Sequence, residues 1–155
     1  KIQAGVKIAV ISDAGTPGIS DPGFLLVRAC IEKGIEIETL PGPTSLIPAL
    51  INSGLPSDRF CFEGFLPVKK GRNKRLSGLR EEQRTMIFFE SPFRLVRTLD
   101  DMAGVFGAER AASVSRELSK IYEENMRGTI ASLAAHYREK PPRGEIVLVV
   151  SGKES

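Results

Sequence analysis

Long apolar runs, cysteine and histidine are all scarce in this 155-residue chain, and each scarcity excludes a class of protein. No stretch of about 18 apolar residues is present, so no segment is expected to span a bilayer. The two cysteines, Cys30 and Cys61, are too few for a disulfide scaffold or a four-cysteine zinc site, and both stand in apolar stretches typical of a core. A reducing cytoplasm is the expected location.

Several catalytic signatures are missing as well. His136 is the only histidine and falls in a predicted surface helix, so we expect neither a histidine triad nor a metal centre. The patterns GxxxxGK[ST] and GxGxxG are absent, which excludes a P-loop and a dinucleotide-binding fingerprint.

What is present is an ordinary globular composition. The chain is 41% hydrophobic and 26% charged, with 22 Lys and Arg against 19 Asp and Glu, and its length suits one domain or two small ones. It begins at Lys1 and enters an apolar run almost at once. We therefore expect a piece of a longer protein.

Apolar periodicity and turn residues predict an α/β fold. Helices capped by Asp21 and Pro22, and by Thr44 or Ser45, should end near Gly34 and Gly54. The alternation of strands and helices favours a largely parallel sheet, with the apolar run 147–150 in its interior. Strands are predicted over 6–11, 35–39, 60–65, 85–89, 111–115 and 145–150, and helices over about 21–33, 45–54, 92–106 and 132–138.

A linker at 55–58 divides the predicted fold into two domains, 1–56 and 57–155. The first has only two predicted strands and two helices, too few to cover both faces of a parallel sheet. We expect this first domain to be incomplete.

Two turns of the first domain are candidate binding loops. Residues 12–23 follow a predicted buried strand, where ligands of open α/β sheets bind, and Gly15 and Gly18 allow close approach to the backbone. The same glycines are equally typical of a tight connection. The turn at 41–45 is similar, and the hydroxyls of Thr44 and Ser45 suit a ligand or, more commonly, a helix N-cap. The two turns together would form one wall of a pocket.

Positive charge is concentrated in residues 69–84. This segment holds seven Lys and Arg against two Glu, a net charge of +5, whereas the whole chain carries +3. Such clusters contact nucleic-acid phosphates, although a solvated surface face is also common. No aromatic residue lies within the segment, which indicates phosphate positioning and not base reading. The predicted RNA contacts are Lys69, Lys70, Arg72, Lys74, Arg75 and Arg94.

Seven ordered motifs resemble the tetrapyrrole methylase superfamily of S-adenosylmethionine-dependent methyltransferases. They are SDAGTPGISDPG, LPGPTS, GLPSDRF, FEGFLP, FFESPFR, SREL and GEIVLVV. Within that superfamily, the chain is most similar to the group that methylates the 2′-hydroxyl of a cytidine ribose in small-subunit ribosomal RNA. The resemblance implies two α/β domains with the methyl donor in the cleft between them. It also implies a homodimer and a first segment that this chain lacks, so the fragment alone is expected to be inactive.

The resemblance also implies a set of site residues. Thr16 stands where tetrapyrrole-modifying relatives have Asp, which favours the RNA-modifying branch. Glu90, Glu117 and Lys120 are weak candidates for a catalytic base, although Glu117 and Lys120 can simply pair with each other. The implied contacts to S-adenosylmethionine are Asp13, Ala14, Gly15, Thr16, Ile19, Thr44, Ser45, Glu90, Leu118 and Gly144.

Three functions follow as hypotheses. The first is methyl transfer to a ribose of small-subunit ribosomal RNA, with the small ribosomal subunit as partner. The second is methylation of a corrin or porphyrin precursor, whose carboxylates also attract basic residues. The third is a non-catalytic RNA-binding module.

Overall fold

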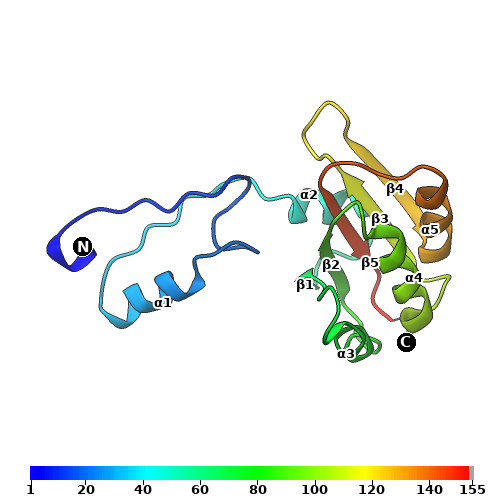
Figure 1. Cartoon of the computed structure of the whole chain (residues 1–155), viewed down its shortest axis with the longest axis horizontal. Coiled ribbons are helices and arrows are strands. Elements are labelled where there is room, and N and C mark those ends of the chain that lie inside the picture. The colour runs from blue at the N-terminus through cyan, green and yellow to red at the C-terminus, as the bar shows by residue number, and fades with distance from the viewer. Residues whose placement is uncertain (154–155) are drawn as a thin grey trace. The chain divides into compact units, whose positions relative to one another are not determined.

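The computed structural model describes residues 1–153 and contains two compact units, Lys1–Thr44 and Ser45–Ser155 (Figure 1). The first unit holds a short 3-10 helix, Ile2–Ala4, and the helix α1, Phe24–Glu32. The second unit contains a five-stranded sheet and its covering helices. Its elements are α2 (Leu46–Ser53), β1 (Phe60–Phe65), α3 (Arg72–Gly78), β2 (Thr85–Glu90), α4 (Leu95–Phe106), β3 (Ala111–Arg116), β4 (Glu124–Thr129), α5 (Ile130–Glu139) and β5 (Ile146–Val150).

The sheet of the second unit is mixed. Its strand order is β1-β2-β5-β3-β4, in which only β1 and β2 are parallel and the other three pairs are antiparallel. The predicted α/β class is therefore confirmed, but the expectation of a largely parallel sheet is wrong, because β5 enters between β2 and β3 in the opposite direction. The interior position predicted for residues 147–150 is confirmed, since β5 is buried along its whole length.

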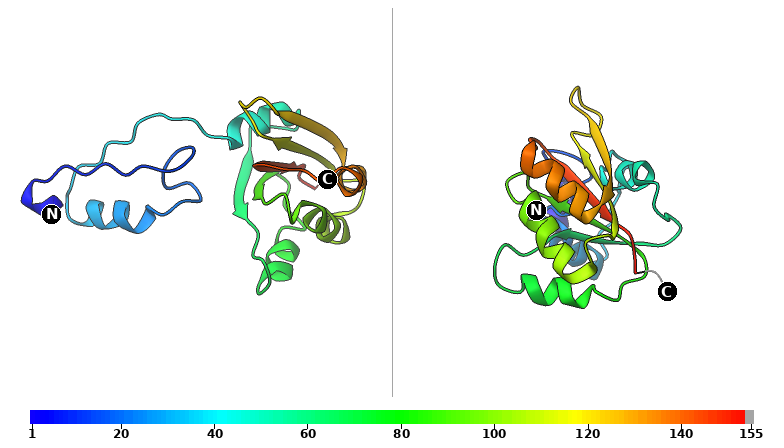
Figure 2. Two further views of the ribbon diagram at one scale, coloured as in Figure 1. Left: turned by 45° about the horizontal axis from the view of Figure 1, so that its top comes forward. Right: turned by 90° about the vertical axis from the view of Figure 1, so that its right-hand side faces the viewer.

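Both faces of this sheet are packed. Along β2, Met86 and Phe88 point into one hydrophobic cluster and Ile87 points into the other, as the two-residue period of a strand requires. Helices α3, α4 and α5 contribute to the first cluster and α2 to the second. Figures 1 and 2 show α4 and α5 side by side along the sheet.

Helix α2 belongs to the second unit. Ala49 and Leu50 are buried against Val147 and Val149 of β5, so α2 covers one face of the sheet. The units consequently divide at 44/45, whereas the sequence predicts a domain boundary at 55–58. The difference arises because α2 packs with residues that are distant in sequence.

The strands predicted over 6–11 and 35–39 do not form, and these predictions are wrong. A strand needs a neighbour for its backbone hydrogen bonds. Within residues 1–153 no segment pairs with either run, and Val6, Ile8 and Val10 are exposed. No helix among the described residues has the length and apolar character needed to cross a membrane.

The glycines predicted to end α1 and α2 are confirmed, whereas the residues predicted to cap their N-termini are not. The N–H groups of Gly34 and Ile35 donate to the carbonyls of Ile31 and Cys30, which is the Schellman pattern that ends α1. At its other end α1 begins at Phe24, so the predicted Asp21–Pro22 cap is wrong. Gly54, with φ of 72°, ends α2 as expected.

Candidate functional site

The two candidate loops lie against each other. The Thr16 hydroxyl donates to the Pro43 carbonyl at 3.0 Å, across 27 residues of sequence. Gly15 lies beside the same carbonyl, since a Cβ atom added at Gly15 would be 3.6 Å from the Pro43 oxygen. The prediction that the 12–23 and 41–45 turns adjoin is therefore confirmed.

The first loop is also fixed internally. The single hydrogen of the Ser12 hydroxyl is within reach of two acceptors, Asp21 Oδ2 at 2.7 Å and the Ala14 carbonyl at 2.8 Å. Gly15 and Gly18 have φ of 74° and 85°, so glycine is needed for the turn itself. Asp13, Ala14, Gly15 and Ile19 are exposed and Thr16 is half-buried. The turn thus combines a required geometry with an accessible backbone.

The hydroxyl of Ser45 is not used as a helix cap. Ser45 occupies the N-cap position of α2, yet its side chain makes no capping hydrogen bond. Thr44 precedes it and is half-buried. The capping role predicted for Ser45 is wrong, which leaves its hydroxyl free for a ligand.

In the second unit, the predicted site residues gather at one edge of the sheet. The register places Glu90 opposite Ile146, and Ile146 opposite Arg116. The ends of β2 and β3 and the start of β5 therefore share this edge. The predicted residues located there are Glu90, Glu117, Leu118, Lys120 and Gly144.

The Glu90 carboxylate is committed to internal hydrogen bonds. Its Oε1 accepts from the Ser91 N–H at 2.6 Å and from Arg94 Nε at 2.9 Å, and its Oε2 accepts from the Thr98 hydroxyl at 2.6 Å. The side chain is only 1% exposed. These hydrogen bonds show that the carboxylate orders the 91–94 loop, and its contact with the methyl donor stays a prediction. Arg94, a predicted RNA contact, is held by it at 2.8 Å.

Arg72 continues the same network. Its guanidinium donates to Thr98 at 2.8 Å, to Asp101 at 2.8 Å and to the Pro67 carbonyl at 3.3 Å. The residue is buried, so its predicted contact with RNA phosphate is wrong. Neither Thr98 nor Asp101 is singled out by any sequence motif, and only the packing of α3 on α4 brings them to Arg72.

Glu117, Lys120 and Gly144 form a second local structure. The carboxylate of Glu117 accepts from the Glu145 N–H at 2.9 Å and from Lys120 Nζ at 2.9 Å. A Cβ at Gly144 would overlap this carboxylate. The Glu117 carboxylate alone is enough to require a glycine at position 144, without any ligand. The alternative in which Glu117 and Lys120 pair with each other is confirmed.

The electrostatics of this pair oppose a role as base. The hydrogen bonds from Glu145 N–H and Lys120 lower the pKa of Glu117. The carboxylates of Glu117 and Glu145 raise the pKa of Lys120. Glu117 is thus a weakened base, and Lys120 stays protonated near neutral pH. Leu118, next to them, packs half-buried on the α2 face of the sheet.

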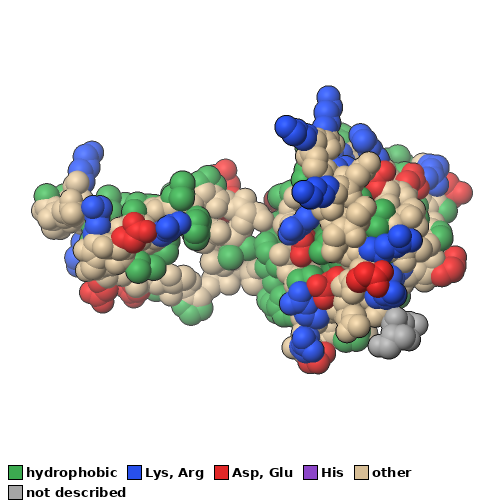
Figure 3. All heavy atoms as spheres, turned by 90° about the horizontal axis from the view of Figure 1, so that it is seen from below, with side chains coloured by type: hydrophobic (Ala, Val, Ile, Leu, Met, Phe, Trp, Pro, Cys, Tyr) green, Lys and Arg blue, Asp and Glu red, His purple; other side chains and the backbone are tan. Residues whose placement is uncertain are grey.

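The remaining predicted RNA contacts are exposed. Lys69, Lys70 and Lys74 lie on the surface and make no ion pair within residues 1–153. Arg75 is half-exposed and pairs with Glu63 at 2.5 Å. Figure 3 shows Lys and Arg side chains interspersed with Asp and Glu on one face of the second unit.

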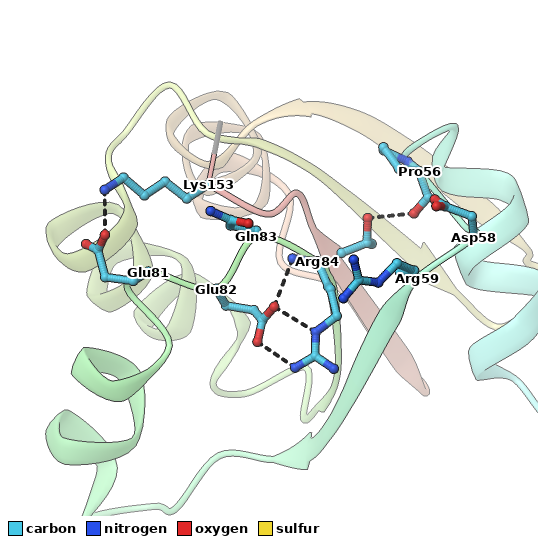
Figure 4. A pocket seen from close by; sticks show the side chains of 9 residues that line it. Pro56, Asp58, Arg59, Glu81, Glu82, Gln83, Arg84 and Lys153 are labelled. Atoms are coloured by element: carbon cyan, nitrogen blue, oxygen red, sulfur yellow. Dashed lines mark hydrogen bonds and ion pairs between the residues drawn. The ribbon is translucent and has the colours of Figure 1, made fainter. Parts of the chain in front are cut away.

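A shallow hollow opens at the opposite edge of the sheet, where β1 and β2 begin (Figure 4). Two ion pairs line it, because Arg84 pairs with Glu82 at 2.7 Å and Lys153 pairs with Glu81 at 2.5 Å. Arg84 lowers the pKa of Glu82 to about 2. None of the predicted site residues lines this hollow, and of its charged residues Asp58 and Arg59 make no ion pair within residues 1–153.

Comparison with known proteins gives one family and several relatives. Residues 1–134 match the family described as Tetrapyrrole (Corrin/Porphyrin) Methylases. A protein of Synechocystis named ribosomal RNA small subunit methyltransferase I is 52% identical over 153 residues, which are 98% of this chain and 55% of that protein. The protein of the same name from Thermotoga maritima is 45% identical, over 99% of this chain and 68% of its own length. The chain thus spans little more than half of the Synechocystis relative.

Solved structures show the same fold at low identity. A cobalt precorrin-4 methyltransferase matches with a TM-score of 0.66 and 16% identity, over 88% of this chain and 61% of that one. Uroporphyrin-III C-methyltransferase from Thermus thermophilus, complexed with S-adenosyl homocysteine, matches with a TM-score of 0.61 and 17% identity, over 88% and 62%. At such identities these matches show the fold alone.

Proposed function

The chain belongs to the tetrapyrrole (corrin/porphyrin) methylase family, and we propose that its protein is an S-adenosylmethionine-dependent methyltransferase acting on small-subunit ribosomal RNA. The proposed acceptor is the 2′-hydroxyl of a cytidine ribose. The observation that carries this proposal is the identity of 52% and 45% to the two relatives named as small-subunit ribosomal RNA methyltransferases, over nearly the whole chain.

The 12–23 and 41–45 turns offer groups that suit the methyl donor. The fixed 12–23 turn exposes backbone at Ala14 and Gly15, and Ser45 has a free hydroxyl. Such amides and hydroxyls match the carboxylate and ribose of S-adenosylmethionine. We assign its binding to Asp13, Ala14, Gly15, Thr16, Ile19, Thr44 and Ser45.

The proposed chemistry depends mainly on alignment. Bound S-adenosylmethionine supplies a sulfonium-activated methyl group, so the protein has to orient the ribose hydroxyl and exclude water. Glu90 is buried and Glu117 and Lys120 are paired, which leaves none of the three candidates suited to remove the hydroxyl proton. In this proposal their role is to hold the loops at one edge of the sheet.

RNA would be held through its phosphates. The exposed cations of residues 69–84 without an ion-pair partner in residues 1–153 are Lys69, Lys70, Lys74 and Arg80. Arg75 and Arg94 pair with Glu63 and Glu90. Counterion release from such contacts gives a salt-dependent affinity. This arrangement supports RNA over a compact tetrapyrrole.

A tetrapyrrole precursor is the second candidate substrate. It is favoured by the family description, Tetrapyrrole (Corrin/Porphyrin) Methylases, which matches residues 1–134. The family as a whole is a broader match than the relatives at 52% and 45% identity, which are named as RNA methyltransferases, so this candidate is the weaker one.

We also propose that the protein works in the cytoplasm as a homodimer. A ribosomal substrate supports the first statement, and the resemblance to the family supports the second. Light scattering of the purified protein checks the dimer. A monomeric mass at micromolar concentration would contradict it.

The experiment for this function compares two acceptors. The whole protein is incubated with labelled S-adenosylmethionine and either small ribosomal subunits that lack the modification or a uroporphyrin-type precursor. Label is expected in the ribosomal RNA; label only in the tetrapyrrole would establish the second candidate. If calorimetry with the whole protein detects no S-adenosylmethionine binding, the protein is a non-catalytic RNA-binding module.

A further inference from the structure

One aromatic side chain is almost fully exposed on a loop that is firmly fixed. Phe93 is 97% exposed, the highest fraction for any large hydrophobic residue in the described chain. Its loop is nevertheless held at both ends, because Ser91 N–H donates to Glu90 and Arg94 N–H donates to the Ser91 carbonyl at 3.0 Å. Its exposure therefore does not come from a loose loop, and it needs an explanation.

A second loop at the same sheet edge carries cations that make no ion pair within residues 1–153. It follows β1, which is parallel to β2, so both strands end at this edge. Phe65 and Val68 are each 54% exposed there, and Lys69 and Lys70 follow directly. Lys74, in the first turn of α3, adds a third unpaired cation.

The buried network joins these two loops. Arg72 bonds to the Pro67 carbonyl on one side and to Thr98 on the other. Thr98 in turn donates to Glu90, which holds Ser91 and Arg94. The lysine-bearing loop and the Phe93 loop are therefore tied to each other through three buried side chains. No local sequence pattern indicates this juxtaposition, since Pro67 and Glu90 are 23 residues apart.

We infer that these two loops form a binding surface for single-stranded RNA, in which Phe93 stacks on an unpaired base and Lys69, Lys70 and Lys74 contact phosphates. The inference rests on the proposed RNA substrate and extends it to a base contact. Phe65, half-exposed beside Phe89 with ring centroids 5.6 Å apart, is a second stacking face.

The chemistry of the surface favours a single strand. In duplex RNA the bases are stacked on one another, whereas loops and bulges present bases that aromatic side chains can stack on. An apolar partner that covered this surface would bury the charges of Lys69, Lys70 and Lys74 without a counter-charge, and their desolvation would cost free energy. A flexible polyanion with flat apolar bases satisfies both groups at once.

The experiment measures fluorescence anisotropy of a labelled single-stranded RNA of about ten nucleotides with the full chain. Phe93→Ala should weaken binding roughly tenfold, as the loss of one base–aromatic stack does, and Phe93→Tyr should restore it. Tyr122→Ala removes another exposed aromatic, in the β3–β4 loop, and is the matched control with unchanged affinity.

The salt dependence separates stacking from charge. Phe93→Ala should leave the slope of log affinity against log salt unchanged. The double substitution Lys69→Gln and Lys70→Gln should reduce the slope by roughly 0.7 for each phosphate that is no longer neutralised. Circular dichroism checks that each variant is folded.

Two outcomes overturn the inference. The first is equal RNA affinity of Phe93→Ala and wild type, which shows that Phe93 does not contact a base. The second is a change in the oligomeric mass of Phe93→Ala without a change in its RNA affinity. Either result leaves the proposed function intact if methyl transfer to ribosomal RNA persists. Absence of RNA binding by the whole protein would remove the RNA substrate and this inference together.

Discussion

Gly144 shows how a single residue of the sheet edge is fixed by its neighbours. Its φ is 85°, and the Glu117 carboxylate occupies the space where a side chain would begin. Gly144→Ala should therefore destabilise the second unit by about 1–3 kcal/mol, through left-handed strain and displacement of Glu117. Urea unfolding followed by circular dichroism measures this loss.

Gly104 provides the matched control for that substitution. It lies inside α4, and a Cβ there would meet no atom within 4 Å. Gly104→Ala should raise the free energy of unfolding by about 0.5–1 kcal/mol, because alanine loses less backbone entropy in a helix. If both substitutions change stability equally, the explanation given for Gly144 is wrong.

The Cys61 thiol should be unreactive near neutral pH. Partial burial and the negative charges of Glu82 and Glu63 raise its pKa to about 11. Because the thiolate is the nucleophile, the alkylation rate of a Cys30→Ser variant by iodoacetamide should keep rising up to about pH 11. A rate that levels off near the ordinary thiol pKa of about 8.5 would contradict the structure around Cys61.

At the scale of elements, the Arg72 network fixes α3 on α4. Arg72→Met removes one partner of a buried ion pair and should lower the free energy of unfolding by roughly 2–4 kcal/mol. This loss is smaller than for a fully buried pair, because Asp101 is one-third exposed. Arg97→Met is the control, since Arg97 contacts the same Asp101 at 4.0 Å but is 67% exposed. It should cost less than about 1 kcal/mol. Comparable losses in urea unfolding would refute the structural role of Arg72.

The same elements show what a sequence can predict. Strands with apolar runs, such as β2 and β5, are located almost to the residue. Strand β4, with the sequence ENMRGT, is missed because it is a polar edge strand without an apolar alternation. Strand direction is also mispredicted, because pairing between distant segments decides it and no local pattern contains that pairing.

The candidate site is predictable in a similar way. The turns around Thr16 and Pro43 carry local glycine and proline signals, and their contact is confirmed. What the sequence does not show is the burial of the Glu90 and Arg72 side chains, which pack against α4. Burial of a charged residue depends on tertiary packing, so composition alone favours surface roles for both.

At the scale of the molecule, the two units should differ in their ability to fold alone. The second contains both hydrophobic clusters and the whole sheet, whereas Cys30 is the only buried residue among 1–44. A protein of residues 45–155 should unfold cooperatively, and a peptide of residues 1–44 should show no transition. Thermal circular dichroism of both tests this, and a cooperative transition in the peptide would contradict it.

The atom that is methylated distinguishes the proposed function from its alternatives. The whole protein is incubated with S-adenosylmethionine and unmodified small ribosomal subunits, and the RNA is digested to nucleosides for mass spectrometry. We predict one new species, cytidine with the added methyl group on the ribose 2′-oxygen. A methyl group on a base, or no methylated nucleoside while a tetrapyrrole precursor is methylated in parallel, would contradict methyl transfer to the ribose.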